Sequence, residues 1–215
     1  MKIGILGSGA VGRTLGTAFL KEGHQVMLGT RNVNKDEVVK WKNENPGAET
    51  GLFDTTAGFG ELIVLATSGS ITEEVIQLAG TENFGGKTVI DATNPIAPSP
   101  PDHGVLKFFT TLDDSLMERL QRLLPAANFV KAFNSVGSGF MYKPDFNGVA
   151  PSMFICGNSE EAKSTVTSIL VSFGWAVEDM GSAASARAIE PLCMLWCIPG
   201  FLNNQWSHAF KLLKK

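Results

Sequence analysis

Short apolar runs alternate along the chain with segments in which apolar positions recur at helical spacing. The first run, residues 2–6, is followed by a helical pattern over residues 11–20, and Gly23-His24 ends that pattern before a second run at residues 25–28. Strands and helices that alternate in this way favour an α/β protein with a doubly wound parallel sheet. The further predicted strands are residues 49–52, 61–66, 88–92, 129–133, 153–156 and 176–178, and the further predicted helices are residues 36–45, 74–78, 114–124 and 160–173.

The turn between the first strand and the first helix reads Gly7-Ser8-Gly9-Ala10-Val11-Gly12. In a dinucleotide-binding unit the first glycine permits a tight turn, the second lets the backbone approach the pyrophosphate, and the third lets helix and strand pack closely. The helix N-terminus then offers unpaired N–H groups and the positive end of its dipole to the phosphates. Because strand, turn, helix and second strand follow in the required order, the sequence predicts that Gly7, Ser8, Gly9, Ala10, Val11 and Gly12 bind a dinucleotide.

The residue about 20 positions beyond the glycines distinguishes NAD from NADP, because a carboxylate there accepts from the ribose 2′-OH and would repel a 2′-phosphate. Here that position falls at Thr30 and Arg31, and Lys35 follows a turn later. A hydroxyl and a guanidinium that can hold phosphate through two parallel hydrogen bonds predict a 2′-phosphate pocket, and hence NADP as the cofactor. The alternative is that Arg31 and Lys35 are ordinary solvated charges.

We therefore expect a Rossmann-type, NADP-binding, doubly wound and mostly parallel sheet over residues 1–180, and a short C-terminal helical extension over residues 181–215. The extension holds more apolar bulk than one helix can bury on one face. It could roof the substrate cleft, contact a second subunit, or pack in the core. The large apolar groups are Leu192, Met194, Leu195, Trp196, Phe201, Trp206 and Phe210.

Composition limits the class of protein. A content of 44% hydrophobic and 18% charged residues is ordinary for a folded globular chain. With a net charge of −3 and scattered Lys and Arg, nucleic acid is not expected as a partner. The longest apolar stretch, residues 192–202, is too short to cross a bilayer, and the first strand leaves no room for a targeting peptide. We expect a cytoplasmic protein without membrane insertion.

In such sheets ligands bind beyond the carboxyl ends of the strands, at the switch point. This rule places residues 66–70, 93–95 and 132–135 around one cleft with the glycine turn. Residues 97–104 run beside the cleft as either a binding loop or a solvated, proline-stiffened connection. The candidate cofactor contacts in these segments are Ala66, Thr67, Ser68, Asn94 and Ala132, and the candidate substrate contacts are Asn94, Pro95, Asn134 and Trp196.

Three cysteines do not make a disulfide framework. Cys193 and Cys197 are four residues apart, so on a helix they share a face and could ligate a metal or respond to oxidation. No nearby His or Cys completes a four-ligand set. Core packing is favoured for both, and no metal site is expected.

Beyond the glycine turn the chain carries a set of short motifs in a fixed order. They are Leu28-Gly29-Thr30-Arg31 with Lys35, Asp91-Ala92-Thr93-Asn94-Pro95, Lys131-Ala132-Phe133-Asn134, Cys156-Gly157-Asn158, and residues 184–192 with Glu190-Pro191-Leu192 at their end. The set covers nearly the whole chain and resembles the deazaflavin-dependent NADP oxidoreductase family, the reductases of coenzyme F420. It is also similar to the cytosolic NADPH domain of six-transmembrane ferric reductases.

The resemblance implies that Thr30, Arg31 and Lys35 bind the 2′-phosphate, that Ala132 lies near the nicotinamide, and that the C-terminal segment both roofs the cleft and joins a homodimer. Two departures concern the acceptor. Asn158 stands where the family often has Asp, and Ser68-Gly69-Ser70 stands where a Pro-Trp type sequence is common. The small-molecule acceptor therefore stays open among a deazaflavin, a flavin, a ferric chelate or another compound.

Hydride transfer to a planar ring requires two closely stacked rings and no protein nucleophile, so no catalytic side chain is assigned. His24 at a turn, His103 in the loop 97–104 and His208 on the C-terminal helix are expected to be structural or solvated. If one histidine acts, His103 is favoured because its loop lies nearest the cleft.

Three classes of function remain. The leading one is an NADP(H)-dependent oxidoreductase that acts on a deazaflavin, a flavin or a similar planar acceptor. The second is a reductase or dehydrogenase of a small carbonyl or imine, although those enzymes usually carry a long all-helical second domain. The third is a sensing module that holds NADP without turnover.

Overall fold

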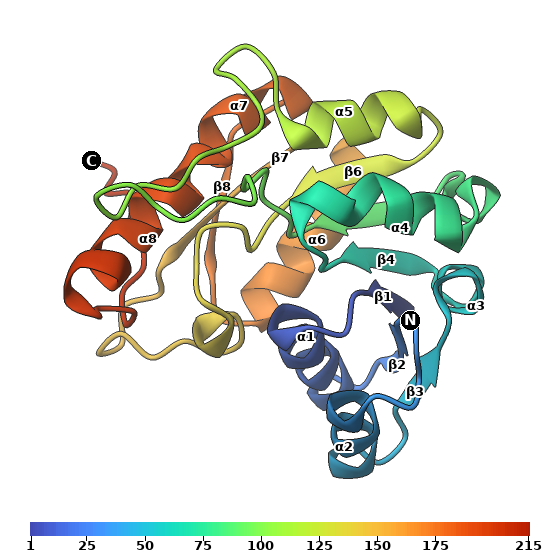
Figure 1. The fold of residues 1–215 in the computed structure, drawn as a ribbon. Coiled ribbons are helices and arrows are strands. Elements are labelled where there is room, and N and C mark those ends of the chain that lie inside the picture. The colour runs from blue at the N-terminus through green and yellow to red at the C-terminus, as the bar shows by residue number, and fades with distance from the viewer.

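The computed structural model describes residues 1–215. Its strands form one eight-stranded sheet in the order β3-β2-β1-β4-β5-β6-β7-β8 (Figure 1). The strands are β1 (Lys2–Leu6), β2 (Gln25–Gly29), β3 (Glu49–Gly51), β4 (Leu62–Leu65), β5 (Thr88–Asp91), β6 (Asn128–Lys131), β7 (Ser152–Gly157) and β8 (Ala176–Asp179). Strand β1 pairs in parallel with both β2 and β4, so the chain changes direction across the sheet there.

Helices cover both faces of this sheet, and two hydrophobic cores lie beneath them (Figure 1). One core lies under α1 (Ala10–Lys21), α2 (Asp36–Glu44) and α6 (Glu160–Ser172). The other lies under α3 (Phe53–Phe59), α4 (Thr72–Ala79), α5 (Leu116–Leu123) and α7 (Ala186–Ile189). The last helix is α8 (Pro191–Asn203). The predicted doubly wound, mostly parallel α/β fold is confirmed.

Apolar runs predicted the positions of the strands, because each interior strand is buried on both faces and therefore needs a near-continuous hydrophobic sequence. All four residues of β4 are buried, for example. Two short helices were not predicted: α3 has seven residues and α7 has four. Such segments are too short to show a helical period in the sequence, and contacts with the sheet select their conformation.

The sheet departs from a purely parallel arrangement at one position. Strand β7 pairs antiparallel with β6, through Val130 with Gly157 and Lys131 with Cys156, while β7 and β8 are again parallel. The long connection from residue 132 to residue 151 allows the chain to reverse its direction before it enters β7. An apolar run is equally compatible with either direction, so the sequence pattern could not reveal the reversal.

The expectation that His208 lies on the C-terminal helix is wrong. Helix α8 contains Pro199 and ends at Asn203, where Asn204 adopts the left-handed conformation at φ 53°. The rest of the chain folds back beside β7, and the Ser152 N–H donates to the Phe210 carbonyl at 2.9 Å. Asparagine tolerates this conformation better than most residues, and it gives the helix a sharp end.

None of the helices combines the length and the apolar character that a bilayer crossing requires.

Candidate cofactor and active site

The three glycines of the first turn occupy three different environments. Gly7 has a φ of +126°, and a Cβ there would lie 2.3 Å from the Ala66 carbonyl oxygen. A Cβ on Gly12 would lie 1.8 Å from the Gly7 carbonyl oxygen. A Cβ on Gly9 would meet nothing within 4 Å. Gly7 and Gly12 are therefore required by the fold, whereas Gly9 leaves open space in front of the turn.

The N-terminus of α1 is free to receive an anion. Gly9 is the N-cap residue, no side chain caps the helix, and its first turn contains no acidic residue. The first N–H groups of a helix have no partner within the helix, and the dipole concentrates positive potential around them. The open space at Gly9 lies beside these groups, so this end of α1 fits a pyrophosphate.

A cavity of about 200 Å³ joins the glycine turn to the residues after β2 and β4. The residues predicted to bind the 2′-phosphate and the residues predicted to contact the cofactor after β4 all line this cavity. Ala10, Val11 and Gly12 continue from the turn into α1 outside this lining. The residues that line it are Gly7, Ser8, Gly9, Thr30, Arg31, Lys35, Phe53, Ala66, Thr67, Ser68 and Ile71.

Thr30 and Arg31 play different parts at this cavity. Thr30 is 2% exposed, and its Oγ1 accepts hydrogen bonds from the Ser8 hydroxyl at 3.2 Å and the Asn32 N–H at 3.3 Å. Thr30 thus ties the second strand to the glycine turn. Arg31 is half exposed, and its Nη2 donates to Oε1 of Glu74 at 2.9 Å. An exposed ion pair of this kind contributes about 0–1 kcal/mol, so Arg31 can exchange Glu74 for a phosphate at little cost.

A second hollow of about 480 Å³ adjoins the first on the far side of Arg31. Its apolar walls are Leu52, Phe53 and Leu78, and both leucines are about half exposed. The sequence pattern did not predict a role for these residues. The available signal was weak, because an exposed leucine is common on protein surfaces and becomes informative only beside a cavity.

Asn94 and Asn134 face each other beyond the ends of β5 and β6. Asn94 Nδ2 donates to the Asn134 carbonyl at 2.9 Å, and Asn134 Nδ2 donates to the Ile189 carbonyl at 2.9 Å. The Oδ1 atom of Asn134 is buried without a hydrogen-bond partner. Phe133, which directly precedes Asn134, adopts the left-handed conformation at φ 63°, which is strained for a bulky side chain. Buried Ala132 precedes it, and buried Pro95 follows Asn94.

Trp196 is turned toward the loop after β6 and the C-terminal tail. It is 7% exposed, a Cβ on Gly137 would lie 2.8 Å from its ring, and its Nε1 donates to the His208 carbonyl at 2.8 Å. The imidazole of His208 stacks on the indole at 5.0 Å between ring centroids, and its Nε2 lies 2.8 Å from the Trp196 carbonyl. Trp196 therefore fixes α8 to the loop that borders Asn134.

The loop over residues 97–104 is a narrow excursion with antiparallel contacts. Ile96 bridges to Phe108, Asp102 bridges to Val105, and the tip turns through left-handed residues His103 and Gly104. A Cβ on Gly104 would lie 3.0 Å from Leu202 of α8, so the tip packs on that helix. The His103 side chain is 96% exposed.

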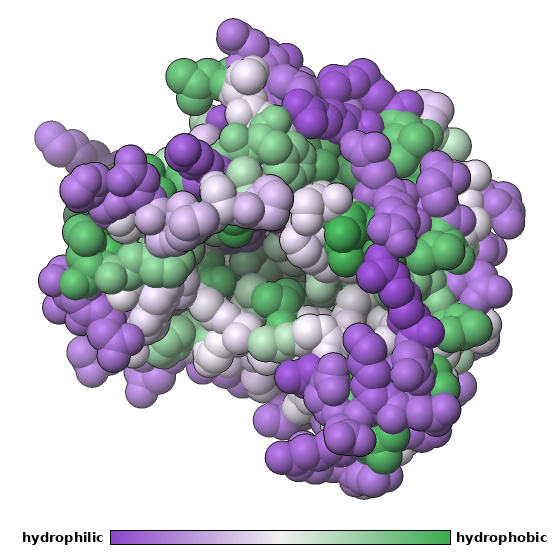
Figure 2. Space-filling view, in the orientation of Figure 1, coloured by the Kyte–Doolittle hydropathy of each residue, from purple (hydrophilic) through white to green (hydrophobic).

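Figure 2 shows a hollow in the middle of the face drawn in Figure 1, between the regions of α1 and α8, and its surroundings are largely hydrophobic or neutral.

A buried charge triad lies beneath Asn94 and Asn134, and the sequence analysis missed it. Lys131 Nζ lies 2.7 Å from Oδ2 of Asp91 and 2.9 Å from Oε1 of Glu190, and all three side chains are at most 2% exposed. Lys131 also donates to the Thr93 carbonyl at 3.0 Å. Burial disfavours the ammonium, but the two carboxylates outweigh it and raise the pKa of Lys131.

The triad explains why three of the sequence motifs occur together. Asp91 ends β5, Lys131 ends β6, and Glu190 precedes α8, so the three charges join both strands to the C-terminal helices. Glu190 also accepts the Leu116 and Met117 N–H groups at 3.0 Å each, at the start of α5. A charged residue at the end of an apolar strand was the available signal, because a buried charge requires a partner.

The three cysteines differ in environment, and no group of three or more His, Cys, Asp or Glu side chains is arranged to hold a metal ion. Burial raises the pKa of the Cys156 thiol to about 12. The interaction between the neighbouring thiols of Cys193 and Cys197 raises the pKa of Cys193 and lowers the pKa of Cys197. Cys197 is also the only one of the three that is not buried.

We expect one reactive thiol in the folded protein. At mildly alkaline pH a chromogenic disulfide reagent should modify Cys197 rapidly, because the thiolate is the nucleophile and only Cys197 combines access with a lowered pKa. Cys197→Ser should remove the fast phase, and denaturant should expose the remaining thiols. A fast phase that survives Cys197→Ser would contradict this assignment.

Comparison with known proteins agrees with the geometry of the glycine turn. The family described as NADP oxidoreductase, coenzyme F420-dependent, matches residues 2–95. A solved structure from Arthrobacter sp. FB24, assigned as an F420-dependent NADP reductase, is 32% identical, covers 100% of both chains and superposes with a TM-score of 0.93. The chain belongs to the F420-dependent NADP oxidoreductase family.

Members of this family and their relatives include two curated proteins similar to the chain. Rat metalloreductase STEAP3 is 31% identical over 214 residues, which cover 94% of this chain and 39% of the relative. The F420-dependent NADP reductase of Methanocaldococcus jannaschii is 27% identical over 205 residues, which cover 91% of this chain and 90% of the relative. Both resemblances inferred from the sequence are confirmed, and the chain spans well under half of the rat protein.

Proposed function

We propose that this F420 oxidoreductase family member binds NADP(H) along the glycine turn and transfers hydride between the nicotinamide and a planar deazaflavin, flavin or similar acceptor. The observation that carries the proposal is the single cavity in which Gly7–Gly9, Thr30, Arg31 and Lys35 come together. A hydroxyl and two cations there suit a 2′-phosphate, and no carboxylate lines the cavity to repel it.

The cofactor is proposed to extend across the carboxyl ends of the strands. The hollow walled by Leu52, Phe53 and Leu78 suits the adenine ring, and the N-terminus of α1 suits the pyrophosphate. The nicotinamide is assigned to the ends of β5 and β6, near Asn94 and Ala132. When bound, NADPH supplies the hydride, and the protein holds the two rings in register and excludes water.

The acceptor assignment draws on the relatives and on the region around the cleft. Two of the similar proteins are named for coenzyme F420, and the third is named as a metalloreductase. The central hollow has the apolar surroundings that a planar ring needs (Figure 2). We assign residues 181–215 the role of completing this cleft and contacting a second copy in a homodimer.

The function is tested by an anaerobic NADPH-oxidation screen. The acceptors are a deazaflavin, FMN, FAD and a ferric chelate, together with a small ketone and a cyclic imine. The proposal predicts that oxidation requires one of the ring acceptors. Turnover of only the ketone or imine would contradict it, and bound NADPH that no compound oxidises would indicate a sensing module.

Arg31→Ala should remove most of the preference for NADPH over NADH. Loss of a charge-assisted bond to phosphate is expected to cost about 1–3 kcal/mol, which lowers NADPH affinity about 5- to 150-fold and leaves NADH affinity unchanged. Titration calorimetry with both nucleotides measures the change. Arg122→Ala is a matched control, because it removes another exposed arginine paired with a carboxylate, and it should alter neither affinity. Equal affinity of the unmodified protein for both nucleotides would contradict the assignment.

A further inference from the structure

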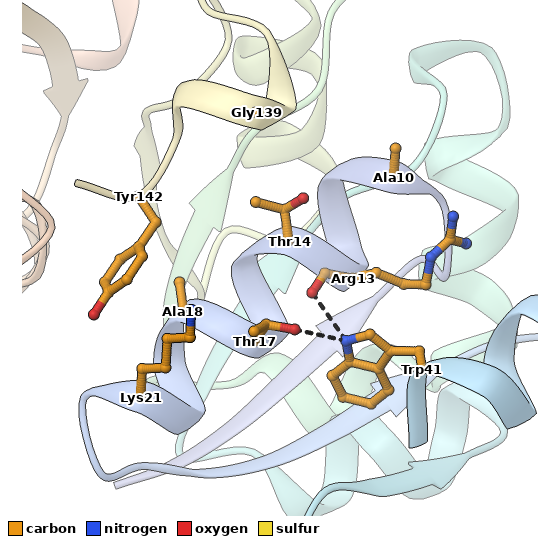
Figure 3. A pocket seen from close by; sticks show the side chains of 9 residues that line it. All are labelled: Ala10, Arg13, Thr14, Thr17, Ala18, Lys21, Trp41, Gly139 and Tyr142. Carbon is orange, nitrogen blue, oxygen red and sulfur yellow. Dashed lines mark hydrogen bonds between the residues drawn. The ribbon is translucent and has the colours of Figure 1, made fainter. Parts of the chain in front are cut away.

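A groove of about 410 Å³ follows the outer side of α1, apart from the cofactor cavity (Figure 3). Six residues of α1 line it, and four of them carry polar side chains, namely Arg13, Thr14, Thr17 and Lys21. Trp41 of α2 and Tyr142 of the loop after β6 line the groove from opposite sides of α1.

Both cations of the groove lack a carboxylate partner. Arg13 Nη1 donates to the Ser8 carbonyl at 2.6 Å, and Lys21 Nζ lies over the Tyr142 ring at 5.6 Å from its centroid. No acidic residue lines the groove. The nearby Glu22 carboxylate is occupied elsewhere, because its Oε1 accepts from the Tyr142 hydroxyl at 2.8 Å and pairs with Lys143 Nζ at 3.0 Å. The groove therefore presents two uncompensated positive charges.

The polar groups of the groove are spread along the length of α1 and do not form one cluster. Trp41 Nε1 donates to Thr17 Oγ1 at 2.9 Å and to the Arg13 carbonyl at 3.0 Å, which fixes one wall. Figure 3 draws no hydrogen bond at the Thr14 hydroxyl, so this group can donate to a ligand in the groove. From Ala10 to Lys21 the helix rises about 16 Å. This length suits an extended chain that carries negative charge.

The groove begins where the acceptor ring is expected to lie. Ala10 is the first residue of α1, directly after Gly9, and Gly139 belongs to η3 (Ser138–Phe140) in the loop that leaves β6 after Asn134. These two residues stand at one end of the groove, and Lys21 and Tyr142 stand at the other (Figure 3). The proposed function places the phosphates of NADP at the glycine turn and in the cavity beside Arg31, whose lining shares no residue with the groove. The groove is therefore available to the second substrate.

We propose that this groove binds the phosphate-bearing tail of the electron acceptor, with Lys21 and Arg13 as cationic contacts and Thr14 as a hydroxyl donor. The inference rests on the function proposed above, because it requires an acceptor whose planar ring lies over the nicotinamide. A flavin or deazaflavin carries its phosphate on a flexible chain attached to the ring. With the ring in the cleft, the chain leaves between Ala10 and Gly139 and runs toward Lys21.

The test compares ligands that differ only in the phosphate-bearing tail. Fluorescence titrations measure the Kd of FMN and of riboflavin, and of a deazaflavin with and without its tail, on protein saturated with NADP⁺. In whichever of the two pairs the protein binds, Lys21→Gln should raise the Kd of the phosphate-bearing ligand about fivefold. The Kd of the ligand without the tail should not change. Added salt should reduce the difference in the unmodified protein. Lys40→Gln removes an exposed lysine of α2 outside the groove and should change nothing.

Equal affinities for tailed and tail-free ligands, in both pairs, would overturn the groove assignment, as would the absence of binding by all four. A Lys21→Gln variant that loses NADPH affinity in the same proportion would also overturn it, because the groove would then serve the cofactor. The acceptor screen separates this failure from failure of the proposed function. If the protein reduces tailed and tail-free rings with equal Michaelis constants, the proposed function stands and the groove proposal is contradicted.

Discussion

Gly9→Val is expected to abolish NADPH binding while the protein stays folded. A Cβ at Gly9 would contact nothing, and its φ of −71° is accessible to any residue, so the fold tolerates the side chain. The added methyl groups instead fill the open space that fits the pyrophosphate, beside the uncapped N-terminus of α1. Calorimetric titration should show no binding at nucleotide concentrations that saturate the unmodified protein.

Two glycine substitutions make this result interpretable. Gly85→Val adds the same side chain where a Cβ has its nearest neighbour at 3.8 Å, far along the sequence from the turn, and should change neither binding nor stability. Gly12→Ala should lower both, because its Cβ would lie 1.8 Å from the Gly7 carbonyl oxygen. A Gly9→Val protein that unfolds at the same denaturant concentration as the unmodified one and still binds NADPH would place the cofactor elsewhere.

Lys131→Met is expected to have the largest effect on stability. The substitution leaves the carboxylates of Asp91 and Glu190 buried, close together and without their shared cation. Removing one member of a buried ion pair lowers the free energy of unfolding by about 3–5 kcal/mol. Chemical denaturation followed by circular dichroism measures the loss.

Lys163→Met is the matched control, because Lys163 is also buried but pairs with two partly exposed carboxylates. The side chains of Glu160 and Asp179 are 86% and 44% exposed, so water solvates them when the lysine is lost. This variant should lose about 1 kcal/mol or less. Equal losses for the two lysine variants would contradict the structural importance of the triad.

The raised pKa of Lys131 also predicts the sign of the pH dependence. A group whose pKa is higher in the folded state gives its full stabilisation below its unfolded pKa and loses it as the pH rises through the folded value. The contribution of Lys131 is therefore complete at neutral and mildly alkaline pH.

The sequence was sufficient for the features that depend on local pattern. Apolar runs located the strands, and the spacing of Gly7, Gly9 and Gly12 located the first turn. Gly7 and Gly12 report a requirement of the adjacent backbone, whereas Gly9 leaves open space in front of the turn. The antiparallel direction of β7 was not visible, since a buried strand has the same composition in either direction. The end of α8 at Asn203 was missed because the large apolar residues Trp206 and Phe210 follow it at helical spacing.

The sequence pattern could not predict features that depend on contacts between segments far apart in the chain. Asp91, Lys131 and Glu190 each appeared within a separate motif, but only the fold brings both carboxylates within 3 Å of Lys131 Nζ. The hollow walled by Leu52, Phe53 and Leu78 was missed for a similar reason, since Leu52 and Leu78 belong to different segments and are ordinary surface leucines when considered singly. Thr30, Arg31 and Lys35 were predicted from their spacing from the glycines, and the fold places all three in one cavity with the glycine turn.

The most direct test of the account follows a labelled hydride from NADPH to the acceptor. NADPH that carries deuterium on one face of nicotinamide C4 is mixed anaerobically with a deazaflavin, and the mass of the reduced acceptor is measured for each of the two labelled forms. The account predicts that deuterium reaches the acceptor from one form only, and that NADH reacts far more slowly. Reduction without deuterium from either form, or equal transfer from both, would contradict direct hydride transfer in a fixed site.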